Sequence, residues 1–88
     1  MPRGDAAIIN KLGLHARPSA RLTALASKFT AEVWLTKNGR RVNAKSIMGV
    51  MMLAAARGST LVIEASGADE EQAVEALREL IASGFSEE

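Results

Sequence analysis

The 88-residue sequence contains no cysteine and only one histidine. Without cysteine the chain can form no disulfide framework, and it offers no thiolate for nucleophilic chemistry. A single histidine cannot supply the several imidazole or thiolate ligands that a zinc site requires. We therefore expect no metal site and no bound cofactor.

Long apolar runs are missing as well. No stretch approaches the roughly 18 apolar residues that a membrane-spanning helix needs. The first seven residues, MPRGDAA, lack the apolar centre of a signal peptide. These absences predict a cytoplasmic protein that does not insert into a membrane.

The chain as a whole has no large excess of one charge, but its two halves do. The formal net charge is +1, which gives no reason to expect a nucleic-acid partner. Residues 1–45 contain nine lysines and arginines against two acidic residues, a net charge of +7. Residues 46–88 contain two against eight, a net charge of −6. We expect the folded molecule to be electrically polarised.

The length and composition indicate one globular domain. A chain of 88 residues is long enough to bury one core. Apolar residues make up 48% and charged residues 24%, as in ordinary soluble domains. We therefore predict a single domain spanning residues 1–88.

Four short segments have the composition of strands. The Asn38-Gly39 pair tolerates positive φ and predicts a hairpin between the middle two. Arg40 and Arg41, just after this turn, are interpreted as solvated strand charges. The expected strands are residues 5–9, 31–36, 40–44 and 59–66.

Two helices are expected in the first two thirds of the chain. The first begins at His15 or Ala16, because Pro18 is tolerated only in a first helical turn. The second follows Ser46, a residue typical of N-caps, and closes with Gly58. Gly49 weakens its middle, so we expect it to be short.

A third helix completes the pattern. Asp69 and Gln72 resemble a capping box before an apolar stripe, and Gly84 can end the helix. The order β-α-β-β-α-β-α predicts an α+β fold, a four-stranded sheet with three helices on one face and solvent on the other. Such folds serve many functions, so the function has to be inferred from a site.

The candidate site lies in GLHARPSA, residues 13–20, where a loop turns into a helix. The backbone N–H groups of Ala16 and Arg17, together with the positive end of the helix dipole, form an anion site beside His15. The Arg17 guanidinium can add charge-assisted hydrogen bonds. A phosphoryl group on His15 would fit there, and the neutral imidazole has the lone pair needed to attack phosphorus. The alternative is an exposed loop histidine beside a solvated arginine.

The strings GLHARPSA and NAKSIMGVMML (residues 43–53) together resemble the family of histidine-containing phosphocarrier proteins (HPr) of the bacterial phosphoenolpyruvate-dependent phosphotransferase system. The resemblance implies an open-faced β-sandwich whose antiparallel sheet has the order 1-4-2-3. It also implies that enzyme I transfers a phosphoryl group to Nδ1 of His15, which passes it to a histidine of an IIA protein or domain. On this interpretation the chain is a relay rather than a complete enzyme, and we expect it to act as a monomer.

The second helix has an outward and an inward side in this interpretation. Val50, Leu53 and Ala54 are expected to pack inward, and exposed methionines suit an adaptable docking surface. Arg21, with the basic first half, could steer acidic partners. By resemblance to the family the docking residues are Ala16, Ala20, Ile47, Met48 and Met51. The alternative is that the apolar residues of this helix all belong to the core.

Ser46 has two interpretations. It is a helix N-cap by position, and the K-S-I-M-G-V pattern of the family implies that it is also phosphorylated by an HPr kinase/phosphorylase. Phosphorylation would then oppose transfer to His15. Two other functions stay open at this point: the nitrogen-related phosphocarrier (NPr), which uses the same chemistry in a regulatory pathway, and a non-catalytic binding module of similar fold.

Overall fold

The computed structural model describes residues 1–86. The expected order β-α-β-β-α-β-α is confirmed, and a short 3-10 turn follows the last helix. The elements are β1 (Arg3–Ala7), α1 (Ala16–Ala26), β2 (Glu32–Lys37), β3 (Arg40–Asn43), α2 (Ile47–Met52), β4 (Thr60–Ser66), α3 (Glu70–Ala82) and η1 (Gly84–Ser86). Within the described residues no helix is long and apolar enough to cross a membrane.

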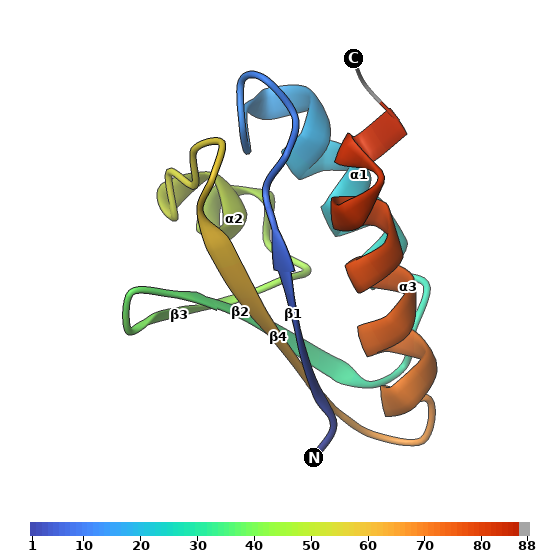
Figure 1. Cartoon of the computed structure of the whole chain (residues 1–88). Coiled ribbons are helices and arrows are strands. Elements are labelled where there is room, and N and C mark those ends of the chain that lie inside the picture. The colour runs from blue at the N-terminus through green and yellow to red at the C-terminus, as the bar shows by residue number, and fades with distance from the viewer. Residues whose placement is uncertain (87–88) are drawn as a thin grey trace.

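The four strands form one antiparallel sheet in the order β1-β4-β2-β3, as expected. Residue Ile63 of the central strand β4 lies opposite Gly4 of β1 and opposite Leu35 of β2. The three helices lie on one face of this sheet, with α1 and α3 side by side (Figure 1). No helix of residues 1–86 lies on the other face, so the architecture is the predicted open-faced β-sandwich.

The core forms where alternate strand residues meet the apolar sides of the helices. On β4 the residues Leu61, Ile63 and Ala65 are fully buried, whereas Val62 and Glu64 between them are partly exposed. This is the period of two that the sequence predicts for a strand with one buried face. The helices contribute the buried side chains of Leu22, Val50, Leu77 and Ile81.

The hairpin between β2 and β3 is confirmed. Its two turn residues, Asn38 and Gly39, have φ values of 51° and 82°. Both values lie in the left-handed region that a two-residue hairpin turn requires.

Two predicted boundaries were wrong. The first strand covers residues 3–7, not 5–9, because the backbone of Ile8 leaves the ladder and exchanges hydrogen bonds with Gly58 and Ser59. The second helix ends at Met52 and not near Gly58, because Ala54 adopts a φ of 50°. This reversal exposes Ala54, which was expected to pack inward, and buries Ala55 instead.

The expected capping box at α3 was also wrong. The Asp69 side chain does not cap the helix that it precedes. It accepts hydrogen bonds from the backbone N–H groups of Thr30 (2.9 Å) and Ala31 (2.8 Å) in the loop before β2. At the start of α3 the Glu70 side chain, and not that of Gln72, is seen to accept a backbone hydrogen bond, from the N–H of Gly67 (2.9 Å). Asp69 therefore joins two distant loops.

Candidate functional site

The loop that carries His15 is braced against the loop before β4. Leu14 donates its N–H to the Ala55 carbonyl (2.9 Å), and Asn10, which is buried, donates its side-chain amide to the Gly13 carbonyl (2.8 Å). Gly13 has a φ of +66°, and a Cβ built on it would lie 2.4 Å from the Ala55 oxygen. Only glycine fits this position. The close contact between the backbones at Gly13 and Ala55 therefore positions Leu14 and His15, which follow.

His15 lies directly at the start of α1, as the sequence predicts. It is the N-cap residue with extended backbone angles (φ −80°, ψ −171°), and its carbonyl accepts the first helical hydrogen bond from the N–H of Ser19 (3.0 Å). The Ser19 hydroxyl in turn donates to the Leu14 carbonyl (3.2 Å). His15 as a whole residue is partly exposed, so its backbone is held in place while the residue still reaches the solvent.

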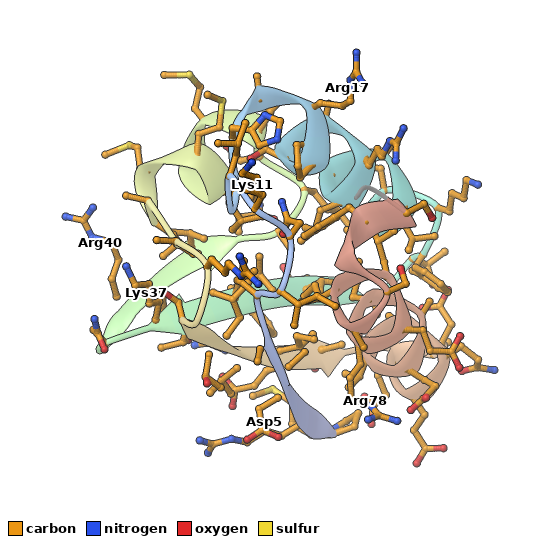
Figure 2. The ribbon with its side chains drawn as sticks, turned by 45° about the horizontal axis from the view of Figure 1, so that its top comes forward. Asp5, Lys11, Arg17, Lys37, Arg40 and Arg78 are labelled. Carbon is orange, nitrogen blue, oxygen red and sulfur yellow. The ribbon has the colours of Figure 1, made fainter. Side chains whose placement is uncertain are left out.

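The first turn of α1 provides the expected backbone donors. The first N–H groups of any α-helix have no acceptor within the helix, so those of Ala16 and Arg17 face the N-terminal end beside His15. Arg17 is exposed, and its side chain extends from α1 away from the body of the molecule (Figure 2).

Arg21 is exposed, and its side chain also contacts η1. Its guanidinium donates a hydrogen bond to the carbonyl of Phe85 in η1. Phe85 is itself completely buried. This contact could not be predicted from the sequence, because 64 residues separate the two partners.

Ser46 caps α2, as predicted from the sequence. Its hydroxyl accepts a hydrogen bond from the N–H of Gly49 (3.1 Å), and its carbonyl accepts from Val50 (3.0 Å). The preceding residue, Lys45, donates its ammonium to the Phe29 carbonyl (2.8 Å). Ser46 therefore has a structural role at the start of this short helix.

The outward residues of α2 are those that the sequence indicated. Ile47, Met48 and Met51 are 40%, 68% and 40% exposed, whereas Val50 and Leu53 are buried. The helix packs beside α1. We give the name α1–α2 face to six exposed apolar residues of these two helices: Ala16, Ala20, Ile47, Met48, Met51 and, not foreseen from the sequence, Met52.

Cations of the β2–β3 hairpin hold the other end of α2. The Lys37 ammonium donates to the carbonyls of Leu53 and Ala54, each at 3.3 Å, and the Arg40 guanidinium donates to the Met52 carbonyl (3.2 Å). Lys37 and Arg40 are seen below α2 in Figure 2. Arg40 is thus not the simple solvated charge that we expected.

Arg41 also differs from that expectation. Its guanidinium lies 4.2 Å from the centre of the Trp34 ring and 3.8 Å from a carboxylate oxygen of Glu64. These contacts are on the open face of the sheet, because Trp34 is paired with Glu64 in the register of β2 and β4. Arg41 therefore belongs to the sheet surface and not to the site around His15.

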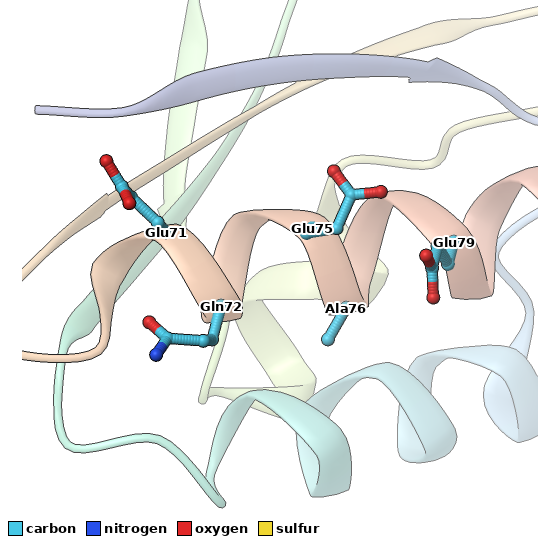
Figure 3. Close-up of a pocket in the computed structure, with 5 residues that line it drawn as sticks. All are labelled: Glu71, Gln72, Glu75, Ala76 and Glu79. Carbon is cyan, nitrogen blue, oxygen red and sulfur yellow. The ribbon is translucent and has the colours of Figure 1, made fainter.

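One hollow of the described surface lies away from the site around His15. It has a volume of about 550 Å³ and lies along α3, between the residues Glu71, Gln72, Glu75, Ala76 and Glu79. Figure 3 shows Gln72 and Ala76 on the side of α3 that faces α1, and the carboxylates of Glu71 and Glu75 on the other side. Its lining contains no histidine and no cation. The acidic lining of this hollow is in line with the negative net charge of residues 46–88.

The fold and the site define a small open-faced β-sandwich that presents one histidine at the start of a helix, beside a second, apolar helix. A family model described as "PTS HPr component phosphorylation site" matches residues 3–83. The chain belongs to this family, the HPr phosphocarriers of the phosphotransferase system.

Close relatives cover nearly the whole chain. It is 59% identical to the phosphocarrier protein HPr of Cupriavidus necator over 87 residues, which are 99% of this chain and 98% of the relative. It is 60% identical to the HPr of Neisseria meningitidis over 80 residues, 91% and 90% of the two chains. The crystal structure of HPr-C-His from Thermoanaerobacter tengcongensis is 48% identical and superposes with a TM-score of 0.96, covering 100% of this chain and 99% of that one.

Proposed function

We propose that His15 is the phosphoryl carrier of this protein. It accepts a phosphoryl group from phosphorylated enzyme I and passes it to a histidine of an IIA protein or domain. The observation that carries the proposal is the position of His15, a partly exposed residue that the braced loop holds at the N-terminus of α1. The relatives that are 59% and 60% identical are named phosphocarrier protein HPr, which favours an HPr over a nitrogen-related phosphocarrier.

The transfer is a displacement at phosphorus. The lone pair of the neutral His15 Nδ1 attacks, the P–N bond to the donor imidazole breaks, and the donor nitrogen keeps the electron pair. The N–H groups of Ala16 and Arg17 and the guanidinium of Arg17 stabilise the charge on the moving oxygens. The partner supplies the rest of the site, so the chain acts as a relay and needs no pocket of its own.

The α1–α2 face would be the docking surface for both partners. Its exposed apolar side chains lie on α1 and on α2, which packs beside it, and Arg17 and Arg21 add positive charge for acidic partners. We propose that the chain works as a cytoplasmic monomer with one domain over residues 1–88.

Ser46 would be a regulatory phosphorylation site for an HPr kinase/phosphorylase. A phosphate there adds about −1.5 to −2 charges at the edge of the α1–α2 face. An acidic partner would be repelled while the helix end tolerates the anion. Comparing Ser46→Asp with Ser46→Ala tests this proposal: transfer from enzyme I should be slower in the Asp variant alone. Equal rates in two folded variants would leave Ser46 as a helix cap.

The main experiment is phosphorylation with labelled phosphoenolpyruvate and enzyme I. We expect one acid-labile, base-stable phosphoryl group per chain and none on His15→Ala. Label on that variant would overturn the assignment. Arg17→Ala should fold normally and transfer more slowly in both directions, whereas a non-catalytic binding module would take no label in any variant.

A further inference from the structure

All four methionines of the chain are exposed, and they are its only sulfur atoms. Met1, Met48, Met51 and Met52 have exposed fractions of 65%, 68%, 40% and 60%. Methionine more often fills gaps in a core. Here the core is built without it, so a change at sulfur leaves the packing of the fold intact.

Three of these methionines lie within five residues on α2. Positions 48, 51 and 52 are three and four residues apart, a spacing that places side chains on neighbouring parts of one helix face. The residues that attach the same helix to the core, Val50 and Leu53, contain no sulfur. The thioethers are thus confined to the side of α2 that is proposed to dock.

We propose that Met48, Met51 and Met52 form an oxidation site that switches docking off. This inference rests on the proposed function of the α1–α2 face. The oxidant is a peroxide, and the modified form is methionine sulfoxide. Conversion of a flexible apolar side chain into a polar one weakens an apolar interface, while the histidine, the braced loop and the core are unchanged.

The reaction is a two-electron oxygen transfer. The sulfur lone pair attacks one oxygen of hydrogen peroxide, an S–O bond forms, the O–O bond breaks, and water leaves after proton transfer. Sulfur is oxidised by two electrons and peroxide is reduced by two. A methionine sulfoxide reductase reverses the change with a dithiol as reductant, which becomes a disulfide as water is released.

The test compares phosphoryl transfer from enzyme I before and after mild treatment of the folded protein with hydrogen peroxide. Peptide mass spectrometry identifies the sulfoxides, and circular dichroism monitors the fold. We expect kcat/KM to fall about tenfold, as when a polar group is buried without a partner. The melting transition should be preserved, and the reductase should restore the rate.

Two variants make the result specific, each compared with its own untreated rate. Met1→Leu removes the sulfur outside α2 and should lose transfer on treatment as the parent does. The triple variant Met48→Leu, Met51→Leu, Met52→Leu keeps the helix apolar and should show no effect of peroxide. Full sulfoxide at the three positions without slower transfer would overturn the inference, as would equal loss in the triple variant. If the untreated parent protein transfers no phosphoryl group, the proposed function itself is contradicted, and the proposed effect of oxidation on docking is contradicted with it.

Discussion

Helices α2 and α3 are attached to the same sheet in different ways. The 13-residue α3 is held by burial, with a stripe of Ala73, Val74, Leu77 and Ile81 against the sheet. The six-residue α2 buries Val50 alone and turns most of its apolar side chains to solvent. An isolated helix of six residues is not stable in water, so other interactions must hold α2.

Those interactions are hydrogen bonds at its two ends. Ser46 caps the start, and Lys37 and Arg40 bind the carbonyls at the end. Because hydrogen bonds hold α2 at its ends, the apolar side chains on its outward side stay exposed and available to a partner. In α3 the apolar side chains are themselves buried against the sheet, so they are not available. This difference fits the proposed docking role of α2, and α3 contributes to stability through its buried stripe.

The largest effect is expected from shortening a buried residue of α3. Leu77→Ala should lower the free energy of unfolding by about 2–5 kcal/mol, because the fully buried side chain leaves a cavity. The matched change on α2 is Met52→Ala, which removes a side chain that is 60% exposed and should cost less than about 0.5 kcal/mol. Urea titration measures both. Similar losses would show that α2 is also held by burial.

A smaller effect is expected at the loop that places His15. Gly13→Ala introduces both a positive φ and a contact with the Ala55 carbonyl, and should cost about 2–3 kcal/mol and slow transfer. Gly39→Ala is the control, because Gly39 has a φ of +82° but nothing within 4 Å of an added Cβ. It should cost about 1 kcal/mol and leave transfer unchanged. Equal results for the two variants would mean that the contact with Ala55 is unimportant.

The periodic parts of the molecule could be predicted from the sequence. The seven elements follow from apolar spacing, and the sheet order follows from the family resemblance. The outward positions of Ile47, Met48 and Met51 were also predicted correctly. These features depend on residues that are close in sequence or on a pattern that extends over an entire element.

The parts that failed depend on single long-range contacts. Nothing in the sequence around Ala54 indicates a φ of 50°, which results from the path that brings Ala55 to Leu14. Asp69 has the local pattern of a capping box, but the loop at Thr30 supplies three hydrogen bonds that compete with that role. Asn10 is of a residue type that is common in turns and usually exposed, so its burial could not be predicted from the sequence.

Asp69, at the start of α3, makes the stability of the fold depend on pH. The N–H of Thr30 is the main cause that lowers the carboxyl pKa below its ordinary value of 3.8, and the N–H of Ala31 adds to it. The carboxylate therefore stabilises the fold above that value, and this stability is lost as the pH falls through the lower pKa of the folded state. Asp69→Asn should be less stable than the parent at pH 7, with the difference shrinking on acidification below pH 4.

Urea midpoints measured at steps from pH 7 to pH 2 test this dependence. Glu71→Gln removes an exposed carboxylate from the same helix and should keep the parent's acid profile. We expect a smaller effect than at Gly13, because these bonds lie at the surface. If Asp69→Asn matches the parent at every pH, the two loops are held together by other contacts.

The smallest effect on stability should accompany a large effect on function, at Met48. This side chain is 68% exposed, so Met48→Glu should change the free energy of unfolding by less than about 0.5 kcal/mol. Transfer from enzyme I should nevertheless fall about tenfold, because a charge replaces an apolar contact at an interface where a few residues carry most of the binding energy. Gln72→Glu adds the same charge on exposed α3 and should alter neither quantity. If Met48→Glu unfolds the protein, this residue is part of the core. If the transfer rate is unchanged, α2 does not take part in docking. Either outcome would contradict the distinction between α2 as a helix that binds partners and α3 as a helix that stabilises the fold.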